Sequence, residues 1–452
     1  MRKLSLVLLG AMFGASVVML GSQTRLLHGG SAIAAASETY RNLTLFGDVF
    51  EKIRTDYVEK LDERKLTEAA ISGMLTSLDP HSSYMDAKSF DDMQVQTRGS
   101  FGGLGFEVTQ EDGRLKVVGV IDDTPAAKAG ILSGDQIAEI NGENVLGLSL
   151  SQAVDKMRGK VDTPVNLTLL RGEKNKVEIS LMRAVIPIKS VRSHLEAPDV
   201  GYIRITEFTE QTYDGLKAAM LKFQEDVPAD KFKGYILDLR NNPGGLLDQS
   251  VAVSNAFLDR GEIVSTRGRN ADESQRYAAQ PLDLSKGKPL AILINGGSAS
   301  ASEIVAGALQ DHKRAIVIGT RSFGKGSVQT IIPLGENNGA ARLTTARYYT
   351  PSGRSIQAKG IDPDIHLAQD VPDDLKGKDE TKGEASLKGH LKNGEDEKRG
   401  SQTYVPTDAS RDKQLSAALD LLRGVKTAAA IEEAAKSADA AQSKDVDSSD
   451  GG

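Results

Sequence analysis

The sequence contains no cysteine, no tryptophan and only six histidines in 452 residues. The absence of cysteine excludes disulfides, thiolate metal sites, iron–sulfur clusters and a cysteine nucleophile. The histidines never occur in an HxxxH or HExxH arrangement, so a zinc hydrolase is disfavoured and we predict no metal and no other cofactor. The chain carries 56 Lys and Arg against 62 Asp and Glu, a net charge of −6, so nucleic acid is not an expected partner.

Length and polarity set the outline of the chain. At roughly 150 residues per domain, the length allows about three domains. Hydrophobic residues make up 39% of the chain and charged residues 26%, which is slightly polar for a compact globule. We therefore expect part of the chain to remain unpacked.

The first 36 residues have the pattern of a targeting segment. Arg2 and Lys3 precede an uncharged stretch over residues 4–24, and the small residues Ala34-Ala35-Ala36 fit a cleavage site. Residues 1–36 are therefore predicted to be a cleaved signal peptide or an uncleaved anchor that associates with the membrane through residues 4–24. Either reading places the rest of the chain in the periplasm or cell envelope. The remaining alternative is that these residues form an amphipathic segment of a cytosolic protein.

Four further segments follow from pattern and composition. Apolar residues at three- to four-residue spacing predict a helical module over 37–98. Short alternating runs separated by glycine-containing turns predict a β-rich domain over 99–184. Strands that alternate with helices predict a larger α/β domain over 185–370. Residues 371–452 are poor in bulky apolar groups, so we predict a largely disordered extension with one short helix near 413–423.

Gly103-Leu104-Gly105-Phe106 opens the β-rich segment. A loop that alternates glycine with apolar residues can turn several backbone N–H groups toward one carboxylate, although a glycine-rich hairpin has the same pattern. The stretches at 125–131 and 134–142 continue the pattern, and the whole unit resembles a PDZ domain. This resemblance implies that Gly103, Leu104, Gly105 and Phe106 capture the carboxylate of a free C-terminal tail.

Asn295 to Glu303 contains a glycine turn and a serine cluster between a predicted strand and a predicted helix. The S-x-x-E spacing of Ser300 and Glu303 is a capping box, so these serines could serve only as helix caps. The same geometry also suits a nucleophile, because the N–H groups of a helix start can stabilise an oxyanion.

Gly319 to Ser327 nearly matches the phosphate-binding loop GxxxxGK[ST], but Gly326 replaces the magnesium-binding hydroxyl. Nucleotide binding is therefore not expected. Lys325 lies between two glycines after a predicted buried strand, where desolvation would lower its pKa and make it a general base. The alternative is a surface lysine in a flexible turn.

Asp238 to Leu246 contains a Pro-Gly-Gly turn after a predicted strand. The paired glycines Gly244 and Gly245 can expose backbone N–H groups, as an oxyanion hole requires. The alternative is a tight turn in which Asp238 and Arg240 form a structural ion pair.

Ser300, Lys325 and Gln329, together with the PDZ-like unit, resemble the carboxyl-terminal processing proteases, which are serine peptidases with a Ser–Lys dyad. Further matching stretches are 77–84, 238–245, 349–354 and 360–364, and the resemblance covers roughly residues 40–370. The resemblance implies a multidomain α+β and α/β protein, with a crotonase/ClpP-like α/β protease core, a PDZ domain and an N-terminal helical module.

The resemblance also implies a role for each matching residue. Ser300 would be the nucleophile, Lys325 the base that takes its proton, and Gln329 the residue that orients Lys325. The oxyanion hole would use the backbone N–H groups of Ala301 and of Gly244 or Gly245.

The expected function is that of an exported endopeptidase that binds apolar C-terminal tails of envelope proteins and cleaves them through an acyl-enzyme. Three alternatives remain: a non-catalytic PDZ scaffold with an inactive protease domain, a hydrolase of small acyl substrates, and a serine nucleophile activated by His312. The sequence leaves open a homodimer or higher homo-oligomer.

Overall fold

The computed structural model describes residues 38–111, 114–172, 175–196, 198–394 and 396–437. The segment predicted to be a signal peptide or anchor, 1–36, lies outside the described residues. The chain divides into two units, residues 1–72 and 73–452. In the part of the chain that the structure describes, no helix is both long enough and apolar enough to cross a membrane.

The described part of the first unit is helical. A helix covers residues 38–56, and α2 (Glu63–Thr76) begins in this unit. The apolar side chains of the first helix are exposed and include Tyr40, Leu43, Leu45, Phe46 and Val49. The apolar spacing that predicts this helix therefore does not mark a core within the described part of the unit.

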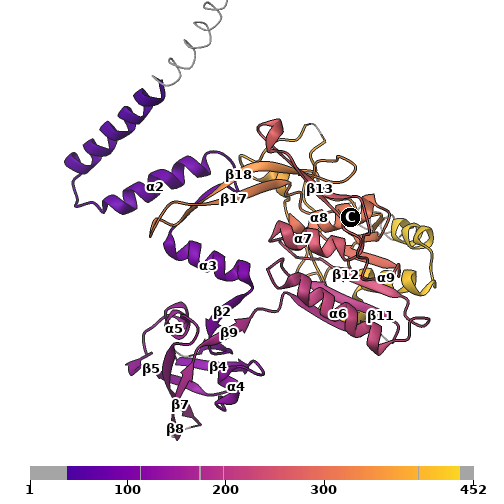
Figure 1. Cartoon of the computed structure of the whole chain (residues 1–452), viewed down its shortest axis with the longest axis horizontal. Helices are drawn as coiled ribbons and strands as arrows, with labels where there is room; N and C mark the ends of the chain where they lie inside the picture. The colour runs from indigo at the N-terminus through magenta and orange to yellow at the C-terminus, as the bar shows by residue number, and fades with distance from the viewer. Residues whose placement is uncertain (1–37, 112–113, 173–174, 197, 395, 438–452) are drawn as a thin grey trace, which may run out of the picture. The chain divides into compact units, whose positions relative to one another are not determined.

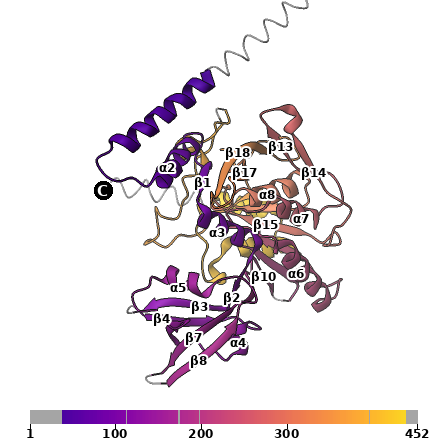
Figure 2. The same cartoon turned by 60° about the vertical axis from the view of Figure 1, so that its left-hand side comes forward.

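The β-rich domain is a six-stranded sheet with the order β3-β4-β5-β7-β8, in which β6 pairs with β5 (Figure 2). The elements are β3 (Phe106–Glu111), β4 (Arg114–Val120), α4 (Pro125–Lys128), β5 (Gln136–Ile140), β6 (Glu143–Asn144), α5 (Leu150–Met157), β7 (Pro164–Arg171) and β8 (Asn175–Met182). Alternate residues of β7, namely Val165, Leu167 and Leu169, are buried in one apolar core. Strands β2 (Ser100–Gly103) and β9 (Ala184–Pro187), which flank the domain in sequence, pair antiparallel.

The α/β domain is built on a second six-stranded sheet with the order β10-β11-β12-β15-β16-β19. Its strands are β10 (Val191–Glu196), β11 (Val200–Ile205), β12 (Gly234–Asp238), β15 (Leu290–Ile294), β16 (Ile316–Gly319) and β19 (Ile365–His366). All neighbours pair in parallel except β10, which runs antiparallel to β11. The strands thus alternate with helices, as the sequence pattern predicts for this domain.

Helices cover both faces of this sheet (Figure 1). One face packs against α6 (Thr212–Asp226), α7 (Leu247–Asn255) and α8 (Ala301–Asp311), and the other packs against α9 (Lys413–Arg423). In β12, Tyr235 and Leu237 belong to the first core, whereas Ile236 belongs to the second. Burial on both faces explains why the parallel strands are continuously apolar.

A further sheet brings distant segments together, with the order β1-β18-β13-β14 and β17 paired with β18. Its strands are β1 (Ser83–Met85), β13 (Glu262–Gly268), β14 (Gln275–Ala278), β17 (Ser327–Pro333) and β18 (Ala340–Tyr349). The remaining named elements are α3 (Ala87–Arg98) and the 3-10 turns η1 (Ala271–Glu273), η2 (Glu384–Ser386) and η3 (Ala409–Arg411). Within the predicted helical module, α2 ends at Thr76, shortly before Asp79-Pro80, and the chain forms β1 before α3 begins.

The C-terminal extension has more structure than its composition predicts. Its described residues include buried polar side chains, Glu384, Asp412 and Gln414, and α9 covers the range that the leucine spacing predicts. The Asp412 carboxylate accepts a hydrogen bond from Leu415 N at the start of α9, and Gly424 (φ 70) ends it. These residues obtain their order from partners in the α/β domain rather than from an apolar core of their own.

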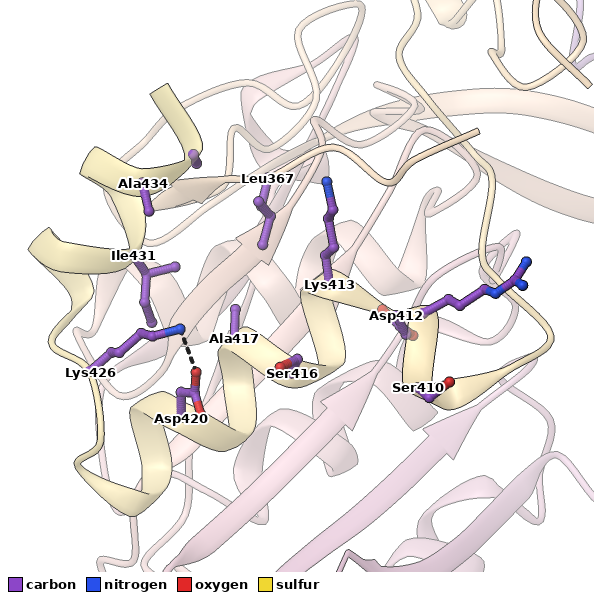
Figure 3. Close-up of a pocket in the computed structure, with 12 residues that line it drawn as sticks. Leu367, Ser410, Asp412, Lys413, Ser416, Ala417, Asp420, Lys426, Ile431 and Ala434 are labelled. Carbon is purple, nitrogen blue, oxygen red and sulfur yellow. Dashed lines mark ion pairs between the residues drawn. The ribbon is translucent and has the colours of Figure 1, made fainter. Parts of the chain in front are cut away.

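A small cavity of about 340 Å³ lies beside α9 (Figure 3). Leu367, Ala417 and Ile431 supply apolar side chains around it, and Lys426 pairs with Asp420 at 2.9 Å. The residues around Ile431 are helical, so two helical segments of the extension pack over the end of β19.

Candidate active site

Ser300 lies in a strained turn between β15 and α8. Its backbone angles are φ 54° and ψ −113°, a region that residues with a Cβ rarely adopt. Such strain costs about 1–3 kcal/mol and persists only where the surroundings enforce it. Ser298 Oγ donates to Leu239 O (2.8 Å) and Ser302 Oγ donates to Asn242 O (3.0 Å), so these neighbouring serines fix the turn.

Glu303 connects the serine turn to the lysine turn. Its Oε2 accepts from the backbone N–H groups of Ser300 (2.7 Å) and Lys325 (2.9 Å). Its Oε1 accepts from Ser322 Oγ (2.5 Å) and the Gly324 N–H (2.7 Å). Burial raises the pKa of Glu303 to about 7, and these four donors oppose that rise. The S-x-x-E spacing predicts only the hydrogen bond between Glu303 and Ser300. The sequence does not indicate the hydrogen bonds that Glu303 accepts from Ser322, Gly324 and Lys325.

Lys325 lies between β16 and β17 and is partly buried. Burial is the main cause that lowers its pKa, and the Arg342 guanidinium lowers it further. The carboxylates of Glu384, Glu303 and Asp79 act in the opposite direction. The environment thus favours the neutral amine, which is the form that a general base requires.

Gln329 lies on β17, beyond the lysine turn. Its Nε2 donates to Ser327 Oγ (2.9 Å) and to Thr344 Oγ1 (3.2 Å). Thr344 Oγ1 in turn donates to Asp79 Oδ1 (3.0 Å). Within the described residues, no hydrogen bond joins Gln329 to Lys325, so its predicted orienting role stays a prediction.

The Pro-Gly-Gly turn packs directly against Ser300. A Cβ on Gly244, which has φ 103°, would lie 2.7 Å from the Ser300 Cβ. The Gly244 N–H donates to Asn242 Oδ1 (2.9 Å). In the described part of the chain, by contrast, the N–H groups of Gly245 and Ala301 have no acceptor. Of the two candidate glycines, Gly245 therefore has the N–H group that is free to bind an oxyanion.

A buried ion network holds the strand that leads into this turn. Arg240 Nη2 lies 2.7 Å from Asp238 Oδ2 and 2.8 Å from Asp412 Oδ2. Tyr202 donates its hydroxyl proton to Asp238 Oδ2 (2.6 Å). Although burial opposes ionisation of both groups, Arg240 lowers the pKa of Asp238, and Asp238 and Asp412 raise the pKa of Arg240. The predicted Asp238–Arg240 ion pair is therefore present, with a third member from the extension.

His312 lies at the opposite end of α8 from Ser300. Since α8 (Ala301–Asp311) has 11 residues at about 1.5 Å each, the two ends are roughly 16 Å apart. The imidazole Nε2 lies 2.7 Å from the Glu262 carbonyl oxygen. The alternative in which His312 activates Ser300 is therefore wrong.

The Gly103–Phe106 loop lies beside a cavity of about 740 Å³. Apolar side chains of β3 and α5 line it, among them Phe106, Val154 and Met157. The Leu104 carbonyl accepts from Ala126 N (2.9 Å), which anchors the loop to α4. Arg158, which also lines the cavity, lies 4.4 Å from the centre of the Phe101 ring. The lining is mainly apolar and also includes the charged residues Glu107, Lys189 and Arg192. In the described residues, no cluster of three or more His, Asp or Glu side chains could hold a metal.

Comparison with known proteins identifies the family. Peptidase family S41 matches residues 199–367, a PDZ domain matches 102–181, and the "Activating protease CtpB N-terminal domain" matches 10–89. The carboxy-terminal-processing protease of Bartonella bacilliformis is 57% identical over 396 residues, which cover 87% of this chain and 91% of that protein. This chain belongs to the carboxy-terminal processing proteases.

Two further relatives match this chain at lower identity. The carboxy-terminal processing protease CtpA of Bacillus subtilis is 37% identical over 369 residues, covering 80% of this chain and 77% of that protein. The solved structure of a photosystem II D1 C-terminal processing protease is 30% identical, covers 74% of this chain and 95% of that chain, and has a TM-score of 0.42. As a carboxy-terminal processing protease of family S41 with a PDZ domain, the chain is a serine-type peptidase, and the family predicted from its motifs is confirmed.

Proposed function

We propose that this carboxy-terminal processing protease cleaves peptide bonds with a Ser–Lys dyad, in which Ser300 is the nucleophile and Lys325 the general base. The observation that carries the proposal is the Glu303 carboxylate, which accepts from the backbone N–H groups of both residues. A single buried group thus ties the serine turn to the lysine turn.

The mechanism follows from these positions. The neutral Lys325 amine takes the Ser300 proton as the hydroxyl oxygen attacks the scissile carbonyl carbon, and the resulting ammonium gives that proton to the leaving amine. The acyl-enzyme ester is then hydrolysed by water activated by the same amine. The N–H groups of Ala301 and Gly245 are proposed to stabilise the oxyanion, with Gly244 shaping the turn. Gln329 would orient Lys325 through its Oε1, since its Nε2 is bound by Ser327 and Thr344.

The PDZ domain is proposed to hold the C-terminal tail of the substrate. The Gly103, Leu104, Gly105 and Phe106 loop would bind the terminal carboxylate, and the apolar cavity beside it would take the last side chain. Peptide binding in this cavity is proposed to control cleavage by shifting the protein from a closed to an open state. We further propose that the protein is exported and that its substrates are envelope proteins with exposed apolar C-terminal tails.

Labelling with a fluorophosphonate tests the nucleophile and excludes an inactive scaffold. We expect the wild-type protein to be labelled and Ser300→Ala to remain unlabelled.

Cleavage of an unfolded protein with an apolar tail tests the substrate, with the same protein carrying a C-terminal amide as the control. Cleavage that is unaffected by Lys325→Ala would contradict the dyad, and equal cleavage of the amidated substrate would contradict carboxylate capture.

The natural substrates require a separate experiment. The C-termini of envelope proteins can be compared between a Ser300→Ala strain and the wild type. We expect apolar C-termini to persist in the mutant, and identical C-termini in both strains would contradict the proposed substrate class.

A further inference from the structure

Residues 379–403 of the C-terminal extension, here called the strap, bind the turns that precede both members of the dyad. On the serine side, the Gly296 N–H donates to Gln402 O (2.8 Å), and Thr381 Oγ1 donates to Gly296 O (3.1 Å). On the lysine side, Thr320 Oγ1 donates to the same Gln402 carbonyl (2.8 Å), and Ser401 Oγ donates to Arg321 O. The strap therefore links the two turns from outside the S41 peptidase region.

Glu384 is the buried acidic residue of the strap, with none of its surface exposed. Its backbone N–H donates to Phe323 O (3.0 Å), two residues before Lys325. Its Oε1 accepts from Gln357 Nε2 (2.9 Å), and Gln357 Oε1 accepts from the Gly326 N–H (3.1 Å), one residue after Lys325. The chain is thereby fixed on both sides of the lysine.

The other carboxylate oxygen of Glu384 lies 2.8 Å from His81 Nε2. His81 follows Asp79, whose carboxylate holds Thr344 and, through it, Gln329. Glu384 thus connects the lysine turn to the segment that supports the predicted orienting residue.

Four charged groups from different elements face Lys325: Arg342 on β18, Glu384 in η2, Glu303 on α8, and Asp79 before β1. Of the three carboxylates, Glu384 has the largest upward effect on the lysine pKa. Since the Glu384 backbone contacts the lysine turn directly and its side chain reaches that turn through Gln357, loss of the side chain should change the position and the basicity of the amine together.

We propose that Glu384 is a positioning residue for the lysine base, acting through Gln357 and the backbone on both sides of Lys325. The inference rests on the proposed Ser–Lys dyad. It assigns to the C-terminal extension a direct part in arranging the catalytic groups.

The test uses the full-length protein and the pH profile of kcat for a peptide with an apolar tail. Glu384→Gln keeps an acceptor for Gln357 but removes the charge, so the midpoint of the rise in kcat with pH should fall by about half a unit or more. Glu384→Ala removes the side-chain hydrogen bonds to Gln357 and His81, so kcat should fall about 10- to 100-fold while KM stays unchanged. Glu384→Asp restores the charge and should restore the midpoint.

Asp396→Asn is the matched control. Asp396 is also a strap carboxylate, but its side chain is 86% exposed, and its one ion pair among the described residues is with Lys359 at 3.6 Å. Its removal should leave both kcat and the pH midpoint at the wild-type values.

The outcomes separate this inference from the dyad itself. A wild-type midpoint in Glu384→Gln overturns the role of Glu384, even where Lys325→Ala is inactive and the dyad stands. Full activity of Lys325→Ala overturns both proposals. If Glu384→Ala fails to fold, the Gln and Asp variants decide the question, because both keep a hydrogen-bonding group at this position.

Discussion

Arg240 and Asp412 form a two-point ion pair, with Nη1 to Oδ1 at 2.9 Å and Nη2 to Oδ2 at 2.8 Å, although 172 residues separate them in sequence. Both side chains are buried. Arg240 also binds Asp238 at the end of β12, and the chain then enters the Gly244-Gly245 turn. The N-terminus of α9 is therefore part of the structure that supports this turn.

Asp412→Ala should destabilise the protein strongly. The change leaves the buried Arg240 guanidinium with one carboxylate partner fewer and removes the cap of α9, so the free energy of unfolding should fall by about 3–5 kcal/mol. Urea denaturation measures the change. Asp408→Ala is the control, because Asp408 is exposed, lies 4.0 Å from Arg411 and accepts hydrogen bonds from its neighbour Ser410 rather than from a buried cation. An equal loss in both variants would contradict a specific role of the ion pair.

The strain at Ser300 predicts an order of stability between two inactive variants. Glycine tolerates φ 54° and ψ −113°, whereas alanine keeps the Cβ that makes this conformation costly. Ser300→Gly should therefore have a free energy of unfolding about 1 kcal/mol higher than Ser300→Ala. Thermal denaturation of the two proteins tests the order, and a more stable alanine variant would show that the turn is unstrained.

The activity should rise with pH through the lowered pKa of Lys325. Below that pKa the amine is protonated, and in the proposed mechanism it then cannot accept the Ser300 proton. The burial that lowers this pKa also costs stability while the lysine is charged, and this cost disappears as the pH rises towards the ordinary lysine value of 10.5. Lys325→Met should therefore be inactive but more stable than the wild type at neutral pH, with a gain that shrinks in alkaline solution. A methionine variant less stable than the wild type at pH 7 would indicate that the lysine is not desolvated.

Glu303→Gln should lower kcat, and its effect on the free energy of unfolding should depend on pH. Replacing one acceptor oxygen by an NH₂ group breaks the junction of the serine and lysine turns, so kcat should fall by at least about tenfold. Because the pKa of Glu303 is raised from 4.5 to about 7, its contribution to stability is full below pH 4.5 and is lost as the pH rises through 7. Because the glutamine side chain does not titrate, the amount by which the variant is less stable than the wild type should be smaller above pH 7 than at pH 4.5. The pH profiles of kcat and of urea denaturation together test this expectation.

Local patterns were sufficient to predict much of the molecule. The glycine and serine residues after β15, and the glycines around Lys325 after β16, mark the positions where strands end at one edge of the α/β sheet, so the motifs themselves indicate the turns. The Gly103–Phe106 loop and the strands of the PDZ domain are also visible in short alternating runs.

Contacts between distant polar residues could not be predicted in this way. Glu384 and Asp412 lie in a segment whose composition is typical of disorder, and their order comes from Gln357, His81 and Arg240 elsewhere in the chain. Composition measures what a segment can bury by itself. It does not measure the hydrogen bonds that a neighbouring domain offers.

The ion pair between Arg240 and Asp412 also has a consequence for biosynthesis. The ribosome makes Ser300, Lys325 and the glycine turn well before it makes Asp412, so a nascent chain carries both members of the proposed dyad while Arg240 still lacks its second carboxylate. The support of the turn beside the proposed nucleophile is therefore completed only after the segment around Asp412 has been made. The groups proposed to react are thus synthesised before the contacts that hold the glycine turn are complete.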